Sequence, residues 1–120
     1  MRRRVLIVDD HPSFRRLATR LLEAAGFSVV GEAEDGASAL AAARRLEPEL
    51  VLLDVLLPDV SGFAVAEALA GDPYRPRVVL VSSRSASELG PALEKSPAAG
   101  FLTKSELTAE ALAAFVDGAG

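Results

Sequence analysis

The side chains best suited to chemistry in this sequence are three carboxylates, a hydroxyl and an ammonium group, and each lies at the end of a run of apolar residues. They are Asp9, Asp10, Asp54, Ser82 and Lys104. Three acids held close together repel one another and are costly unless a cation lies between them. A hard divalent ion with oxygen ligands suits such a site, and Mg²⁺ needs only two or three protein carboxylates because it keeps several waters. The residue types therefore predict a magnesium site.

These groups can meet only if the runs before them are neighbouring strands of one sheet. Continuous β-branched and aliphatic runs predict strands that are buried on both faces. They cover residues 5–8, 27–30, 50–53, 77–81 and 100–102. Segments with apolar residues three and four positions apart predict helices between the strands. These helices cover residues 13–25, 37–46, 63–69, 86–95 and 109–117, with Thr108 and Gly118 at the ends of the last.

This alternation predicts an α/β fold: a doubly wound, five-stranded parallel sheet with helices on both faces. Ligands of such sheets bind outside the carboxyl ends of the strands, where the acids, the hydroxyl and the lysine are expected. A single Asp at a strand end is usually a turn former or a helix N-cap. Three acids on two strands, with a lysine and a hydroxyl on two others, indicate a functional site instead.

Composition limits the classes of function. The 120 residues suffice for one domain that buries roughly two-thirds of its surface, and no linker divides them. A net charge of −4 argues against a nucleic-acid-binding surface. Without cysteine there is no disulfide, thiolate nucleophile or zinc knuckle. The apolar runs are too short to span a membrane, and Met1 leads directly into a strand, so we expect a cytoplasmic protein.

With these features in order, the whole sequence resembles the receiver domain of two-component response regulators. The resemblance rests on the motifs Val8-Asp9-Asp10-His11-Pro12, Leu53-Asp54-Val55-Leu56-Leu57-Pro58 with Gly62, Val81-Ser82-Ser83, and Gly100-Phe101-Leu102-Thr103-Lys104. It implies a flavodoxin-like sheet in the order 2-1-3-4-5 and a single receiver domain over residues 1–120. Ser105 stands where receivers commonly have proline, and Gly90-Pro91 interrupts the fourth helix.

The resemblance also assigns a role to each candidate residue. Asp54 would accept the phosphoryl group, and Mg²⁺ would be bound by Asp9, Asp10, Asp54 and the backbone carbonyl of Leu56. Ser82 would hydrogen-bond the phosphoryl group, Lys104 would pair with it, and Ser82 and Phe101 would form the switch. A carboxylate can attack phosphorus to give an acyl phosphate, while Mg²⁺ and an ammonium neutralise the charge that develops.

The implied partners follow from the same resemblance. The phosphoryl donor would be a sensor histidine kinase or a phosphotransfer protein. A downstream protein, or a second copy of the chain, would bind through helix 4, strand 5 and helix 5, with no direct binding of nucleic acid or membrane. The chain would not be an enzyme beyond catalysing its own phosphorylation and dephosphorylation. We expect a stand-alone receiver because Asp117-Gly-Ala-Gly120 resembles a natural stop.

Three alternatives stay open. The chain could be the receiver fragment of a DNA-binding response regulator. It could be a haloacid dehalogenase-like phosphatase, although those enzymes need an acid two positions after the nucleophile, where this chain has Leu56. It could also be an interaction module that no longer takes phosphate, which the full set of site residues argues against.

Five further residues have interpretations that need no catalytic role. His11 is expected to be an exposed loop histidine outside the catalytic set, and Asp59 and Glu32 are expected to be solvated acids. Gly62 is expected to supply left-handed geometry in the turn after Asp54. For Phe101, packing in the core and a switch role are equally favoured.

Overall fold

The aliphatic runs form the strands of a single parallel sheet, as the sequence predicts. The computed structural model describes residues 3–116. The strands are β1 (Arg4–Val8), β2 (Ser28–Ala33), β3 (Leu50–Asp54), β4 (Arg77–Ser82) and β5 (Gly100–Thr103). They lie in the order β2-β1-β3-β4-β5, which confirms the predicted topology. Val8 of β1 lies opposite Leu53 of β3, so the residues that follow these two strands emerge side by side.

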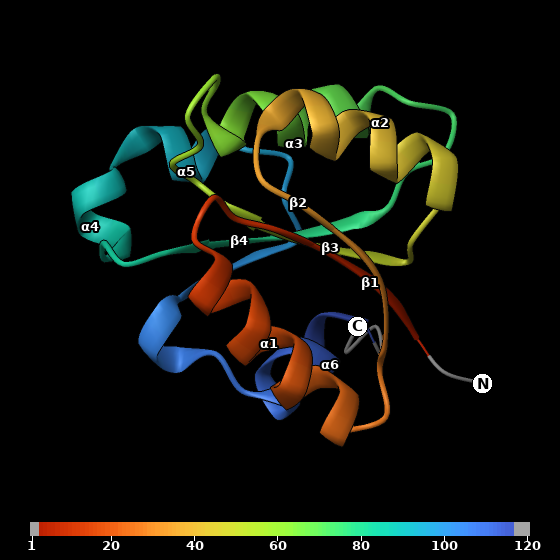
Figure 1. Cartoon of the computed structure of the whole chain (residues 1–120). Helices are drawn as coiled ribbons and strands as arrows, with labels where there is room; N and C mark the ends of the chain where they lie inside the picture. The colour runs from red at the N-terminus through yellow and green to blue at the C-terminus, as the bar shows by residue number, and fades with distance from the viewer. Residues whose placement is uncertain (1–2, 117–120) are drawn as a thin grey trace.

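Helices cover both faces of the sheet. They are α1 (Pro12–Ala24), α2 (Gly36–Leu46), α3 (Gly62–Ala70), α4 (Ala86–Leu89), α5 (Pro91–Lys95) and α6 (Ala109–Val116), with a 3₁₀ turn at Lys104–Glu106. In Figure 1, α2, α3, α4 and α5 lie above the sheet, and α1 and α6 lie below it. The fourth predicted helix is divided at Gly90, and Pro91 is the first residue of α5, where its missing N–H removes no helical bond.

Alternate strand residues point into two separate apolar layers. Leu6 and Leu53 pack toward α2 and α3, whereas Ile7 and Leu52 pack toward α1 and α6. Every residue of β3 is buried, as expected for the central strand of a parallel sheet. Side-chain alternation thus fixes which strand residues face each layer and leaves the strand ends free for polar groups.

The ends and the buried face of the outer helices show how local sequence sets them. Leu17 has helical spacing with the apolar residues of α1, but it is 57% exposed, and the buried stripe runs through Ala18 and Leu22. Gly26 follows the C-cap of α1 with a positive φ of 95°, which glycine adopts without strain. Thr108 accepts a hydrogen bond from Ala111 N at the start of α6, whereas Gly118 and the end of the chain lie outside the described residues. No helix within residues 3–116 has the length and apolar character to cross a membrane.

Candidate functional site

The carboxyl ends of β1, β3 and β5 bring together two buried carboxylates and one ammonium. Asp9 directly follows β1 and is 0% exposed, and Asp54 is the last residue of β3 and is 4% exposed. Lys104 begins the 3₁₀ turn after β5, and its Nζ lies 2.7 Å from Asp9 Oδ2 and 3.6 Å from Asp54 Oδ2. The three strand ends therefore meet at one point, as the doubly wound topology requires.

The two buried acids have pKa values displaced in opposite directions. Burial raises the pKa of Asp54 to about 6, and the negative charge of Asp9 adds to this effect, while Lys104 opposes it. Burial also acts on Asp9, but its pKa is lowered overall because Lys104 and the backbone and side chain of His11 stabilise its charged form. Asp9 is thus held as a carboxylate, whereas the charge on Asp54 is unfavourable in the absence of a further cation.

A set of potential metal ligands surrounds this pair. Ligand atoms of Asp9, Asp10, His11 and Asp54 all lie within 4.8 Å of one another. The predicted carboxylates are thereby brought together. The pKa of Asp54 is raised first by burial and then by the charge of Asp9, so a nearby cation would stabilise its charged form. The residues present fit a hard divalent ion. Leu56 donates its N–H to Asp54 Oδ1 at 3.2 Å, and a role for its carbonyl in binding metal stays a prediction.

Ser82 and Phe101 lie on the strands next to the acids. Ser82 ends β4, is 1% exposed, and its Oγ accepts a hydrogen bond from Arg84 N at 3.0 Å. Because the hydroxyl accepts in that bond, its own proton can be donated to another oxygen. Phe101 is half-buried and packs against the apolar layer of α2 and α3, together with Leu89 of α4 and Leu93 of α5. Phe101 of β5 and these two leucines thus pack against the same buried layer, and a switch role for Phe101 stays a prediction.

His11 has contacts that the sequence interpretation did not include. It is exposed and forms the N-cap of α1, as expected. However, its Nδ1 lies 3.0 Å from Asp9 Oδ1 and 3.2 Å from Asp10 Oδ1, and its backbone N–H also donates to Asp9 Oδ1. The tight turn between β1 and α1 places the ring over both carboxylates. His11 is therefore exposed, as the sequence predicts, and it also contributes to the electrostatics of the site, which the sequence did not reveal.

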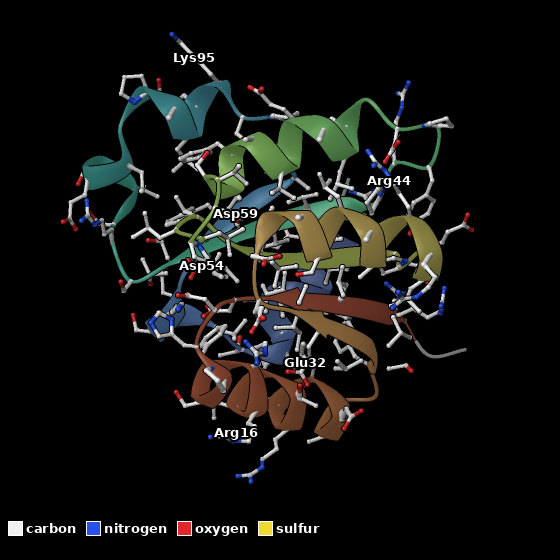
Figure 2. All side chains as sticks on the ribbon, turned by 45° about the horizontal axis from the view of Figure 1, so that its top comes forward. Arg16, Glu32, Arg44, Asp54, Asp59 and Lys95 are labelled. Atoms are coloured by element: carbon white, nitrogen blue, oxygen red, sulfur yellow. The ribbon has the colours of Figure 1, made fainter. Side chains whose placement is uncertain are left out.

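Asp59 is the exposed loop acid that the sequence predicts, but it has hydrogen-bond partners that the sequence did not reveal. It is exposed, but Oδ1 accepts a hydrogen bond from Gly36 N at 2.7 Å and Oδ2 accepts one from Ala37 N at 3.0 Å. These bonds lower its pKa because they stabilise the carboxylate. The loop after β3 is thus fastened to the start of α2. Figure 2 shows Asp54 and Asp59 at the same edge of the sheet, with Arg44 farther along α2. The contact joins residues far apart in sequence, so no local pattern reveals it.

Gly62 is required for a different reason from the one predicted. Its φ is not positive, but a Cβ at this position would lie 2.2 Å from the carbonyl oxygen of Asp54 and 2.9 Å from Val55 Cα. The start of α3 therefore packs directly on the backbone of the site. Only glycine allows that approach without moving the loop between β3 and α3.

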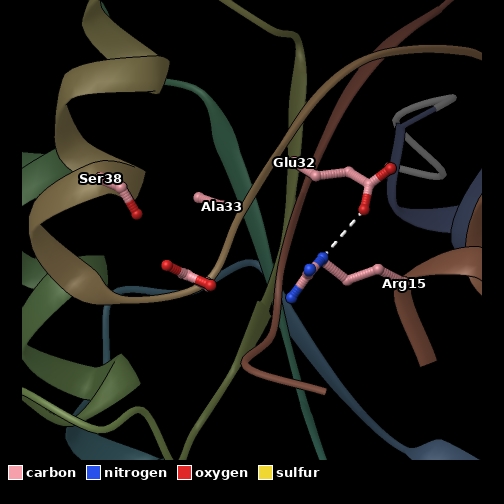
Figure 3. Close-up of a pocket in the computed structure, with 5 residues that line it drawn as sticks. Arg15, Glu32, Ala33 and Ser38 are labelled. Carbon is pink, nitrogen blue, oxygen red and sulfur yellow. Dashed lines mark hydrogen bonds and ion pairs between the residues drawn. The ribbon is translucent and has the colours of Figure 1, made fainter. Parts of the chain in front are cut away.

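A polar cleft of about 270 Å³ lies next to the site, between the end of β2, α1 and α2. Arg15 Nε donates a hydrogen bond to Glu32 Oε1 at 2.9 Å across this cleft (Figure 3). The Arg15 guanidinium also donates to the backbone carbonyl of Asp9. Glu32 lies within β2 and is exposed, as expected for a solvated acid, but it is also ion-paired with Arg15. Arg15 supports the β1 end of the site, and the sequence offered no signal for this role.

Comparison with known proteins gives a consistent result. Residues 5–116 match the family described as response regulator receiver domain. The signal receiver domain of NarL from Mycobacterium tuberculosis has a structure similar to this one, with 36% identity, a TM-score of 0.86 and coverage of 98% of each chain. The chemotaxis response regulator CheY4 of Vibrio cholerae gives 26% identity and a TM-score of 0.82, again over 98% of each chain.

Relatives found by sequence are longer than this chain. The NarL regulatory protein of Mycobacterium tuberculosis is 38% identical over 95% of the chain but only 53% of NarL itself. The DNA-binding response regulator MtrA of Mycolicibacterium smegmatis is 44% identical over 68% of the chain and 36% of MtrA. The chain thus spans about half the length of NarL and less of MtrA. The fold, the strand-end acids and these matches together establish that the chain belongs to the response regulator receiver domain family.

Proposed function

We propose that this receiver takes a phosphoryl group onto Asp54 from a phosphohistidine of a sensor histidine kinase or a phosphotransfer protein. The observation that carries the proposal is the position of Asp54. It is a buried carboxylate at the end of the central strand, with the Lys104 ammonium 3.6 Å away and a pKa raised to about 6. A carboxylate that is costly to leave charged and unpaired is well placed to be modified by an electrophile.

The residues of the site have separable roles in that reaction. A carboxylate oxygen of Asp54 forms a bond to phosphorus as the bond from phosphorus to the donor histidine nitrogen breaks, and the electron pair of that bond stays with the nitrogen. Lys104 compensates the charge on the phosphoryl oxygens, and the Ser82 hydroxyl donates a hydrogen bond to one of them. Mg²⁺, held by Asp9, Asp10, Asp54 and the Leu56 carbonyl, would supply the remaining positive charge. Catalysis is then mostly positioning, and the receiver catalyses only its own modification.

The test is phosphorylation by acetyl phosphate in the presence of Mg²⁺, followed by intact mass measurement. The wild-type chain should gain one phosphoryl group, and Asp54→Asn should gain none. Asp72→Asn is the matched control, because Asp72 is ion-paired with Arg44 away from the site. Labelling of the Asp54→Asn protein would show that the nucleophile is misassigned. Continuous release of phosphate, without a stable adduct, would favour the phosphatase alternative.

Metal binding is tested separately by thermal denaturation. Mg²⁺ binds the folded site, so millimolar MgCl₂ should raise the melting temperature, and NaCl at equal ionic strength should raise it less. An unchanged melting temperature in MgCl₂ would contradict the proposed magnesium site.

The output surface and cellular setting are also proposals. The predicted helix 4, strand 5 and helix 5 correspond to α4 with α5, β5 and α6, and we place the binding of a downstream protein or a second copy there. This choice is supported by Phe101, Leu89 and Leu93, which pack against the same buried layer from β5, α4 and α5. We also propose a cytoplasmic receiver. If it is part of a DNA-binding regulator such as those named among its relatives, an output domain is encoded after Gly120, and the gene sequence decides this.

A further inference from the structure

The Lys104 ammonium has a third neighbour besides the two buried acids. It lies 4.4 Å from the centroid of the Phe14 ring, over the face of that ring. Phe14 is on the first turn of α1, is half-buried, and packs against the apolar layer that contains Ile7 and Ala18. The ring is thus held by the core while its face meets the cation. The face of a phenyl ring carries negative potential, so the contact attracts the ammonium.

The distances around Lys104 show why such a contact matters. The ammonium is closer to Asp9, at 2.7 Å, than to Asp54, at 3.6 Å. The proposed reaction needs it beside the phosphoryl group on Asp54. In the same reaction Asp9 would help to hold Mg²⁺, and a dication beside that carboxylate would weaken its attraction for the ammonium. The Asp9 carboxylate, which lies closest to Lys104, would then hold the ammonium less strongly.

An ammonium that Asp9 holds less strongly can turn to solvent and be hydrated there. The four-carbon stem of a lysine is flexible, its ammonium is strongly hydrated, and the Lys104 side chain is already 22% exposed. The attraction of the Phe14 ring for the ammonium does not depend on the charge or metal occupancy of Asp9 or Asp54. A ring fixed by α1 can therefore hold the cation at the site while its anionic partners change.

We propose that Phe14 is a positioning residue for phosphoryl transfer: its ring face keeps the Lys104 ammonium beside Asp54 when Asp9 binds the metal. This inference rests on the proposed function of Asp54 and Lys104. It assigns to α1 a role in the chemistry, in addition to covering the sheet. An aliphatic side chain could fill the same space but would not attract the cation.

The experiment changes the ring's electrostatics while preserving its shape. Phenylalanines with one, two and three ring fluorines are placed at position 14 in the intact chain, and the second-order rate of phosphorylation by acetyl phosphate with Mg²⁺ is measured. Fluorination makes the ring face less negative but the side chain more apolar. We expect the rate to fall stepwise with each fluorine, and Phe14→Leu to lower it by about 2- to 30-fold. The same series at Phe27, a buried ring of the same apolar layer, should leave the rate unchanged.

A second readout does not depend on phosphorylation. The ring current of Phe14 should displace the NMR shift of the Lys104 ε-methylene group, and the displacement should persist with Mg²⁺ and beryllofluoride and vanish in Phe14→Leu. Mg²⁺ affinity should change less than twofold in Phe14→Leu, because the variant leaves the carboxylates in place.

Each contrary result has a definite meaning. A displaced methylene shift with no change of rate across the fluorinated series would overturn the positioning role but leave the proposed function intact. An equal fall in rate for the Phe27 series would show that packing, and not the cation contact, is responsible, and would also overturn it. If the wild-type chain takes no phosphoryl group on Asp54, the proposed function fails and the positioning role fails with it, whereas the NMR measurement still decides whether Phe14 holds Lys104.

Discussion

Replacing Asp54 by asparagine should make the metal-free domain more stable at neutral pH, although it removes the proposed phosphoacceptor. Asparagine has nearly the same shape as aspartate but carries no charge. The change removes the repulsion between Asp54 and Asp9 and the cost of burying a second carboxylate. Lys104 is not left alone, because its closer partner is Asp9 at 2.7 Å. The variant therefore relieves an unfavourable charge without creating a new one.

The magnitude follows from the pKa of Asp54. Its ordinary value is 3.8 and its folded-state value is about 6, so the folded state binds the proton more tightly than the unfolded state does. Stability from this group is fully present below pH 3.8 and is lost as the pH rises through about 6, with a total loss of about 3 kcal/mol. The advantage of Asp54→Asn should thus be about 3 kcal/mol at pH 7.5 and about 0.5 kcal/mol at pH 4.

The assay is urea denaturation of both proteins in EDTA at several pH values between 4 and 7.5. The difference in unfolding free energy between the two proteins is the relevant quantity, since it cancels the titration of groups they share. Asp72→Asn, which changes an acid paired with Arg44, should show no such increase with pH. A difference that does not grow with pH, or an Asp54→Asn protein that is less stable than the wild type at pH 7.5, would refute the assignment of Asp54 as a destabilised buried charge.

Three further predictions concern the elements around the site. Asp59→Ala should lower the melting temperature by roughly 2 to 8 °C, because two backbone N–H groups of α2 lose their acceptor, and Asp59→Asn should lower it less; equal melting of all three proteins would contradict this. Gly62→Ala should cost about 1 to 3 kcal/mol in urea denaturation, whereas Gly71→Ala, whose Cβ would meet nothing closer than 3.6 Å, should be nearly neutral. In hydrogen exchange, amides of residues 83–95 should exchange faster than those of residues 50–53 and slow on addition of beryllofluoride with Mg²⁺, because α4 and α5 contain no buried residue; equal protection would disprove the idea.

The sheet and its functional edge could be predicted because their signals are local in sequence. A continuous aliphatic run such as residues 50–53 is stable as a strand only when both faces of the strand are buried. The polar residue that ends the run must then lie at the carboxyl edge of the sheet. The same reasoning places Asp9, Asp54 and Lys104 together, and the distances among them agree. The order of the strands in the sheet brings these strand ends together in one site.

The contacts that refine the site could not be predicted because they join distant segments or depend on exact direction. Asp59 meets α2 across more than twenty residues of sequence, and Phe14 meets Lys104 across ninety. The φ of Gly62 is not positive, so its backbone conformation does not require glycine. The requirement comes from the backbone of Asp54 and Val55, which leaves no room for a Cβ at position 62. Leu17 has the right type for the apolar stripe of α1 but lies outside its arc.

The distribution of buried polar groups links stability to function in this domain. Within residues 3–116, the polar or charged side chains that are buried are Asp9, Asp54 and Ser82, and all three are at the carboxyl edge of the sheet. Elsewhere the sheet is closed by apolar side chains that favour a single folded state. The unfavourable charge is thus confined to the place where a metal ion and a phosphoryl group would be bound. Binding there can change the populated conformations of the loops that follow β3 and β4. The apolar core stays packed, because the repulsion that binding relieves lies outside it.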